Sequence, residues 1–146
     1  MKLSISEIVK GAQALTTKTD KIAFLQKHDS QPLQLILRLI YDKEIEFLLP
    51  DTPPPWNKNQ LEDEAKTMLY REARRMKIFI KGGGYDQLKP VKREALFISL
   101  LEDIDNDDAD IIAHNVLLHK PLKGLTLKTL LEAYPNFMET KIIQGS

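Results

Sequence analysis

The sequence contains no cysteine among its 146 residues. Disulfides and thiolate metal sites are therefore excluded, and the composition fits a reducing compartment. Long apolar runs are also lacking, because the longest are far too short to cross a bilayer. The first residues do not have the charged-then-apolar form of a signal peptide. We therefore expect a cytoplasmic protein that has no membrane partner.

The chain has no excess charge of either sign, because 21 basic residues balance 21 acidic ones. That balance argues against strong non-specific binding to nucleic acid. The charges are unevenly placed, however. Residues 66–93 hold nine basic and two acidic residues, a net charge of +7, whereas residues 102–110 hold six acidic ones. A surface with such segregated charge can still meet a polyanion on its basic side.

Motifs for catalysis, metals or cofactors are missing as well. No serine has a local histidine–acid arrangement, and no tandem dinucleotide-binding motif occurs. Residues 81–84, Lys-Gly-Gly-Gly, lack the order and the preceding strand of a phosphate-binding loop, so a helix C-cap and turn explains them better. The aspartates of 103–110 lack the glycine and the terminal glutamate of a calcium loop. His114 and His119 are five residues apart and fall on different helix faces, which favours structural or exposed roles. We expect no catalytic residue, metal or cofactor.

Helical periodicity dominates what is present. The content of 42% hydrophobic and 29% charged residues is typical of a globular domain. Apolar spacing predicts an all-α domain of six to eight helices over residues 1–138, with a tail at 139–146. The expected helices cover about 4–16, 20–27, 30–41, 60–80, 90–104, 107–117 and 126–134. The third is apolar almost all round and is expected to be central.

Local signals support several of these boundaries. Ser4 and Glu7 have the spacing of a capping box, and Ser30 is a good N-cap with Pro32 in the first helical turn. Residues 42–59 change character: 45–49 could form a short extended segment, and 51–56, with three consecutive prolines, cannot form a helix or a central strand. We interpret them as an ordered loop held on the core by Trp56. A proline-rich recognition ligand is the alternative.

The most informative stretch is 117–135, which reads as a helix end, a basic turn and a new helix. Pro121 and Gly124 interrupt the helical pattern, and Thr126 is a suitable N-cap. The turn then presents a glycine, free amides and three lysines at a positive helix end, an arrangement that suits a phosphate. The lysines are Lys120, Lys123 and Lys128. An ordinary capped corner with solvated lysines explains the same residues.

From about Ser6 to Phe137, the chain resembles the all-helical N-terminal DNA-binding domain of ATP-dependent DNA ligases, particularly those of T-even-type phages. The residues that carry the resemblance are 93–101, Arg-Glu-Ala-Leu-Phe-Ile-Ser-Leu-Leu, and 120–130, Lys-Pro-Leu-Lys-Gly-Leu-Thr-Leu-Lys-Thr-Leu. The chain is also similar to small T-even-like phage proteins that have Phe-Leu-Leu-Pro and Pro-Pro segments, a similarity that implies no function.

The ligase resemblance implies that this domain grips duplex DNA across the minor groove at a nick, mainly by phosphate contacts. By position, the contacts would be Lys120, Lys123, Gly124, Thr126 and Lys128. Basic residues of the 66–93 stretch are candidates for the same interface: Arg71, Arg74, Arg75, Lys92 and Arg93. The ligase nucleotidyl-transfer domain and its Lys-x-Asp-Gly motif are missing, so the chain should not seal DNA. It departs from the family at Pro121, inside the turn, and in its proline-rich loop.

Three hypotheses follow, of which the third is an enzyme whose active site is not recognisable from the sequence. The first is a non-catalytic protein that binds intact or nicked duplex DNA and assists phage replication, repair or recombination. The second is a protein-interaction module on the same helical scaffold, such as a phage-encoded regulator of a host enzyme or of the replication machinery. It would use Trp56 with the proline loop, or the acidic residues 102–110. If the turn lysines and the basic residues of 66–93 do not share one face, the first hypothesis loses most of its support.

Overall fold

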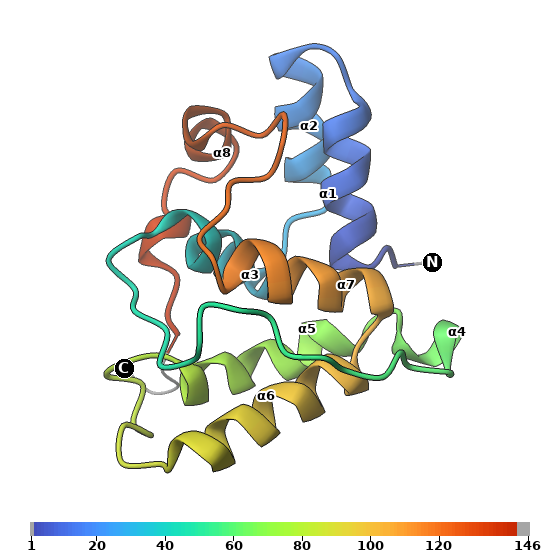
Figure 1. Ribbon diagram of the computed structural model, residues 1–146. Helices are drawn as coiled ribbons and strands as arrows, with labels where there is room; N and C mark the ends of the chain where they lie inside the picture. The colour runs from blue at the N-terminus through green and yellow to red at the C-terminus, as the bar shows by residue number, and fades with distance from the viewer. Residues whose placement is uncertain (1, 143–146) are drawn as a thin grey trace.

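The computed structural model describes residues 2–142, and its regular secondary structure over that range is helical (Figure 1). It has eight α-helices: α1 Ile5–Ala14, α2 Lys18–Lys27, α3 Gln31–Tyr41, α4 Glu62–Ala65, α5 Met68–Glu72, α6 Pro90–Asp103, α7 Asn106–Asp110 and α8 Leu127–Ala133. Three further segments are the 3-10 helices η1 Ala73–Phe79 and η3 Phe137–Glu139 and the π-helix η2 Ile111–Val116. Over these residues the extended pairing is one isolated bridge, Phe47 with Ile80. The prediction of an all-α fold with six to eight helices is confirmed.

Hydrogen bonds at the helix starts explain why the first three helices begin where they do. Ser4 Oγ accepts from the Glu7 amide at 3.1 Å while Glu7 Oε1 accepts from the Ser4 amide at 2.9 Å, so the predicted capping box is present. Ser30 Oγ accepts from the Leu33 amide at 3.2 Å, as predicted. Thr17 caps α2, which therefore starts two residues before the expected Asp20.

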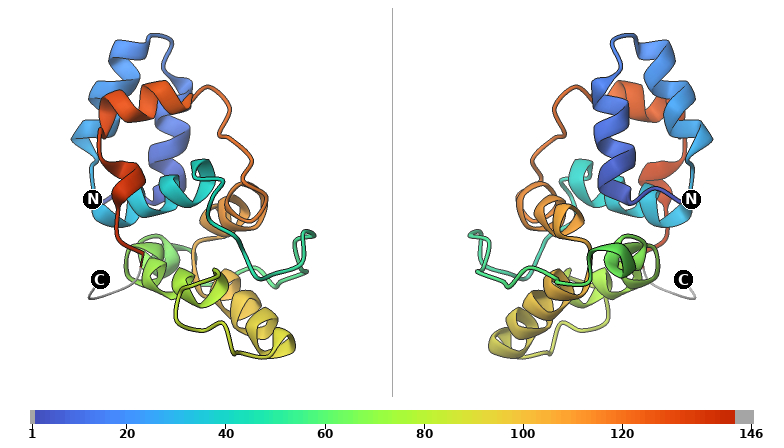
Figure 2. Two further views of the ribbon diagram at one scale, coloured as in Figure 1. Left: turned by 90° about the vertical axis from the view of Figure 1, so that its left-hand side faces the viewer. Right: turned by 90° about the vertical axis from the view of Figure 1, so that its right-hand side faces the viewer.

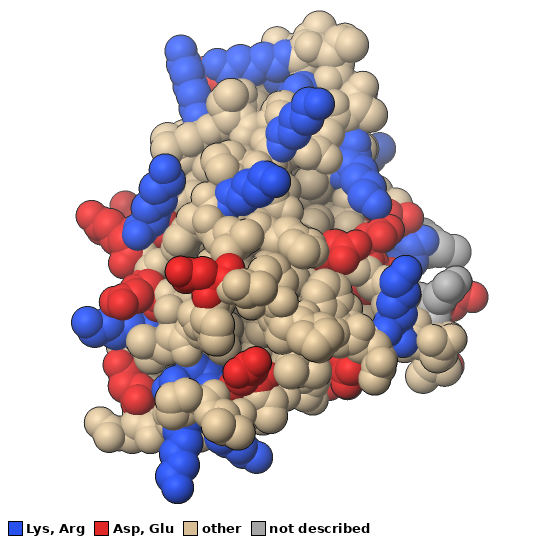
Figure 3. All heavy atoms as spheres, in the orientation of Figure 1, with Lys and Arg blue, Asp and Glu red and all other residues tan. Residues whose placement is uncertain are grey.

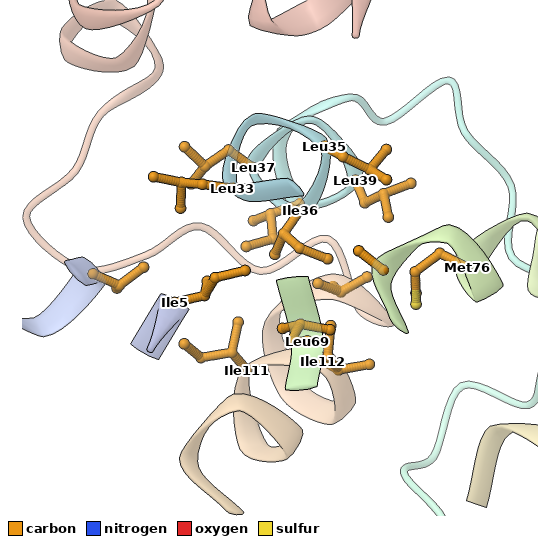
Figure 4. Close-up of a cluster of buried hydrophobic side chains, with 14 of the residues drawn as sticks. Ile5, Leu33, Leu35, Ile36, Leu37, Leu39, Leu69, Met76, Ile111 and Ile112 are labelled. Carbon is orange, nitrogen blue, oxygen red and sulfur yellow. The ribbon is translucent and has the colours of Figure 1, made fainter. Parts of the chain in front are cut away.

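Helix α3 is the centre of the molecule, as its apolar sequence predicts. Six of its side chains are at most 6% exposed: Leu33, Leu35, Ile36, Leu37, Leu39 and Ile40. Figure 4 shows Ile36 pointing toward Leu69 of α5 and Ile112 of η2, with Leu33 and Leu37 on one side of α3 and Leu35 and Leu39 on the other. Burial of each such side chain stabilises the fold by about 1.5–3 kcal/mol. Helices α1, α2 and α8 lie on one side of α3, and α5, η1 and α6 lie on the other (Figure 1).

The single long helix predicted for 60–80 is wrong. The chain forms α4, α5 and η1 in succession, with Thr67 between the first two at a ψ of 6°. In η1 the buried residues are Ala73, Met76 and Phe79. They are three residues apart, which is the repeat of a 3-10 helix, so tightening the helix places all three on one side. Leu61, expected in the core, is 60% exposed.

The first half of helix α6 differs from its helical pattern. Apolar spacing predicts that Val91, Ala95 and Leu101 face the core; Leu101 is buried, but Val91 is 82% exposed and Ala95 is exposed too. Arg93 is 4% exposed instead. Its guanidinium donates to the carbonyls of Ile78, Tyr85 and Asp86 at 3.4, 2.8 and 3.4 Å. These carbonyls satisfy a buried cation that a helical pattern alone would place in solvent.

Smaller corrections concern α2 and α8. Helical spacing predicts that Ala23 lies on the core side of α2, but Ala23 is exposed. The same spacing predicts that α8 docks by Leu127, Leu130, Leu131 and Tyr134, but Leu127 and Leu131 are 40% and 36% exposed. The buried residues of α8 include Leu130 and Ala133. In a short helix, a shift of one residue in the docking face is enough to exchange which leucines are covered.

The loop 42–59 is ordered against α6 and α7. The Asn57 amide donates to Glu102 at 2.7 Å, and the Asn59 amide donates to Asn106 at 2.8 Å. Trp56 packs against the core, with its ring 6.2 Å from that of His114. This arrangement agrees with the interpretation as a loop held by Trp56.

The C-terminal segment begins by packing on α3. The Thr140 carbonyl accepts from Arg38 at 2.7 Å. Of the tail expected at 139–146, residues 143–146 lie outside the described residues. Within residues 2–142, no helix combines the length and the apolar character needed to span a bilayer.

Candidate nucleic-acid interface

The turn between η2 and α8 is fixed on helix α3. The Leu122 amide donates to the Tyr41 hydroxyl at 2.9 Å, and that hydroxyl donates to the Leu125 carbonyl. Leu122 and Leu125 are buried. His119, which has a φ of 49°, places its ring nitrogens 3.3 and 2.7 Å from the carbonyls of Ile40 and Ile45. His119 is therefore structural, and the turn has a defined backbone.

Helices α1 and α2 also hold the turn. Gln13 donates to the Lys123 carbonyl at 2.8 Å, and Lys21 Nζ donates to the Gly124 carbonyl at 2.7 Å. Gly124 has a φ of 79°, which glycine adopts without steric cost. Among the described residues, the amides of Lys123 and Gly124 have no acceptor. The turn therefore presents two backbone donors beside lysine side chains.

Five lysines gather around this turn and the adjoining helices, and we call them the lysine end: Lys18, Lys21, Lys120, Lys123 and Lys128. Residues 15–24 and 117–134 hold these five and two acids, Asp20 and Glu132, a net charge of +3. Lys18 pairs with Glu132 at 2.5 Å. Within residues 2–142 the other four have no ion pair. In Figure 3 the upper part of the molecule shows Lys and Arg with little Asp or Glu.

Lys21 is a residue that sequence reasoning missed. Its contact with Gly124 joins positions 103 residues apart. Nothing in the α2 sequence distinguishes it from the neighbouring Lys18 or Lys27. Thr126, a predicted contact, has its hydroxyl occupied as the N-cap of α8, because it accepts from the Thr129 amide at 3.2 Å. Thr126 thus positions α8.

The structure does not bring the other predicted contacts to the lysine end. Arg71, Arg74, Arg75, Lys92 and Arg93 lie on α5, η1 and α6, in the lower part of the molecule and away from the lysine end (Figure 2). The shared basic face is therefore absent, and the DNA-binding hypothesis keeps only the support of the lysine end.

Three of these arginines are also engaged within the protein. Arg71 and Arg75 both bind Glu72, at 3.1 and 3.3 Å, and Arg75 also binds Asp103 at 3.1 Å. The Arg93 guanidinium is buried and donates to backbone carbonyls, so it is not available to contact DNA.

The acidic stretch 102–110 forms the end of α6 and α7, which lie between the start of α6 and the helices α2 and α8 in Figure 1. Asp105 caps α7 by accepting from the amides of Asp107 and Asp108 at 3.0 and 3.1 Å. Asp107 pairs with Lys10 at 3.1 Å. Among the described residues, no group of three or more His, Asp or Glu side chains is arranged to hold a metal ion.

Asp108 differs from its neighbours because it is fully buried. Its Oδ1 accepts from the Ser6 amide at 2.7 Å, whereas Oδ2 has no partner among the described residues. Burial raises the pKa of Asp108 to about 7, although the Ser6 hydrogen bonds oppose this shift. The nearby Asp105 and Asp107 carboxylates contribute to the same rise in pKa. The sequence placed Asp108 at a helix start but gave no sign of its burial.

Residues 8–120 match a model for a family of unknown function, DUF6433. The chain belongs to the DUF6433 family. The match in this DUF6433 chain runs from α1 to the start of the basic turn and ends at Lys120, so Lys123, Gly124, Thr126 and Lys128 lie beyond the matched residues. Searches of curated proteins and of solved structures found no match.

Proposed function

We propose that this protein is a non-catalytic double-stranded DNA-binding protein that contacts the phosphate backbone with the lysine end. The observation that carries the proposal is the fixed turn at Lys123 and Gly124. It combines two backbone donors with three nearby lysines that have no ion pair among the described residues, Lys21, Lys120 and Lys123. The resemblance to the ligase DNA-binding domain supports the same partner and a role in phage DNA replication, repair or recombination.

The chemistry of the lysine end favours phosphate over bases. Lysine side chains and backbone amides donate hydrogen bonds to phosphate oxygens, which are alike at every base pair. Reading a base sequence would require side chains matched to base edges, such as arginine for guanine or asparagine for adenine. The binding we propose is therefore independent of sequence, reduced by salt, and of modest affinity because the whole chain has no net charge.

Reversal of one turn charge is the direct test. We expect Lys123→Glu to weaken binding to all duplex sequences alike and to lower the salt slope by about one unit, because one phosphate contact is lost. The measurement is fluorescence anisotropy with intact and nicked duplexes at low and moderate salt. Lys58→Glu, which changes the same charge at an exposed loop position, is the matched control and should bind like wild type. Absence of wild-type binding at low salt, or equal effects of the two variants, would sink the proposal.

Gly124 provides a second test. We expect Gly124→Ala to reduce the free energy of unfolding by about 1 kcal/mol, because a side chain at positive φ is strained. The added Cβ would also lie 3.4 Å from Lys21 Nζ and would crowd the phosphate position, so DNA binding should weaken as well. Gly82→Ala has a similar φ, 82°, and open space around its Cβ. Urea denaturation should show similar losses for both variants, while anisotropy with a single duplex should change only for Gly124→Ala. Equal binding by the two variants would exclude close backbone approach at Gly124.

The second candidate is a protein-interaction module, and one observation favours it. The docked loop forms a hollow of about 250 Å³ with α7, lined by Pro55, Trp56, Lys58, Asn106 and Asp110. An aromatic ring beside a carboxylate suits a cationic side chain of a partner protein. This candidate becomes the preferred one if the wild-type protein does not bind duplex DNA at low salt.

A further inference from the structure

A second group of cations lies at the far end from the lysine end. Residues 73–95 hold seven basic and two acidic residues. Three of the seven are engaged within the protein, because Arg75 and Lys81 form ion pairs and Arg93 is buried. The other four have no ion pair among the described residues, and we call them the α6 end: Arg74, Lys77, Lys89 and Lys92.

The backbone that carries the α6 end is well fixed. Arg93 ties η1 to the glycine-rich corner by donating to the carbonyls of Ile78, Tyr85 and Asp86. The carboxylate of Asp86, one of the two acids here, accepts from the Gly82 amide, with both oxygens at 3.0 Å. Lys77 precedes Ile78, whose carbonyl accepts from Arg93. Lys89 and Lys92 lie within four residues before Arg93. The cations therefore stand on an ordered corner.

The two basic ends face different directions. Helices α2 and α8 lie at the top of the molecule and the start of α6 lies at the bottom (Figures 1 and 2). On the face drawn in Figure 3, Asp and Glu are spread over the middle and lower parts, interspersed with Lys and Arg, and few lie at the top. A duplex lying along this face to reach both ends would pass over those carboxylates, which repel phosphate. Separate duplexes, one at each end, avoid the repulsion.

We propose that the α6 end is a second phosphate-binding surface, and that the protein joins two segments of duplex DNA, one at each end. The inference rests on the proposed function of the lysine end and adds an architectural role to it. Both surfaces read phosphate alone, so the two joined segments need not share a sequence.

The test is a capture assay with two duplexes of unrelated sequence. One duplex is fixed to beads and the other is fluorescent, and wild-type protein at low salt should retain the fluorescent duplex on the beads. Lys89→Glu/Lys92→Glu should abolish capture while binding to a single duplex through the lysine end persists. Lys120→Glu/Lys123→Glu should abolish capture too, and should lower the single-duplex salt slope by about two units. The matched control, Lys43→Glu/Lys58→Glu, reverses two exposed loop charges and should still capture.

The outcomes separate the two proposals. Single-duplex binding without capture by the wild type overturns the joining of two duplexes and leaves the proposed function standing. Absence of single-duplex binding overturns the proposed function itself. Capture that survives Lys89→Glu/Lys92→Glu overturns the role of the α6 end. Light scattering of the free protein completes the test: a dimer would carry two lysine ends, and capture by a dimer would also count against the α6 end.

Discussion

Replacement of Asp108 by asparagine is expected to make the protein more stable above about pH 7 and to leave its stability below about pH 4 little changed. The wild-type carboxyl is fully buried and its pKa is raised from 3.8 to about 7. The native state therefore binds an extra proton between these two pH values, and the free energy of unfolding falls as pH rises through this window. Above it the carboxylate is charged in both states, and the loss is complete.

The size of the effect follows from the pKa difference. Each unit corresponds to about 1.4 kcal/mol, so the window from 3.8 to about 7 gives a loss of up to about 4 kcal/mol. Asparagine is neutral at every pH and retains the oxygen that accepts from the Ser6 amide at 2.7 Å. Only the oxygen that has no partner among the described residues is replaced.

The measurement is urea denaturation of both proteins at pH values from about 4 to 8. The informative quantity is the difference between wild type and Asp108→Asn, because carboxylates such as Glu7, whose pKa is lowered, have the opposite pH dependence in both proteins. Asp51→Asn is the control, since that exposed carboxylate lies in the loop 42–59 and is not among the groups that shift the pKa of Asp108. A constant difference across the pH range would show that Asp108 does not titrate in this window.

Arg93→Met is expected to destabilise the protein by about 2–4 kcal/mol. The substitution keeps a long apolar stem but removes every donor, so the carbonyls of Ile78, Tyr85 and Asp86 lose their partner. Arg93→Lys should recover only part of the loss, because an ammonium cannot reproduce the planar fork that reaches several carbonyls. Urea denaturation measures the loss, and hydrogen exchange of the amides in residues 80–89 should show the corner opening first.

Lys92→Met is the matched control, because it removes a neighbouring but exposed cation. Its stability should stay within about 0.5 kcal/mol of wild type. Equal stability of the two variants would mean that Arg93 does not hold the corner. Folded Arg93→Met should also keep its affinity for a single duplex. A large loss of that affinity would return Arg93 to the candidate DNA contacts.

Signals that act within a few residues could be predicted from the sequence. Ser4 and Ser30 cap the helices expected of them, and the continuous apolar run of α3 identifies the central helix. A capping bond spans three residues, so the local sequence contains both partners. A helix that is apolar on every face must be buried in any orientation. The burial of α3 could therefore be predicted without knowing which elements surround it.

Features that depend on distant partners could not be predicted. Helix α6 has apolar residues on more than one face, and carbonyls from another segment decide that Arg93 is turned inward. Asp108 is buried by a contact with Ser6 across 102 positions. Lys21 reaches Gly124 across 103 positions. The sequence identified the turn lysines, but it could not show that the basic residues of 66–93 face away from them.

The arrangement of charge, positive at both ends and negative between them, approximates a linear quadrupole. The field of a quadrupole decays with distance faster than that of a net charge or a dipole, so little of it reaches beyond the screening length of physiological salt. A nucleic acid approaching from afar is therefore neither drawn in nor oriented, and encounters proceed at the ordinary unsteered rate, about 10⁵–10⁶ M⁻¹s⁻¹. Salt would then act mainly on the lifetime of a complex once its contacts have formed.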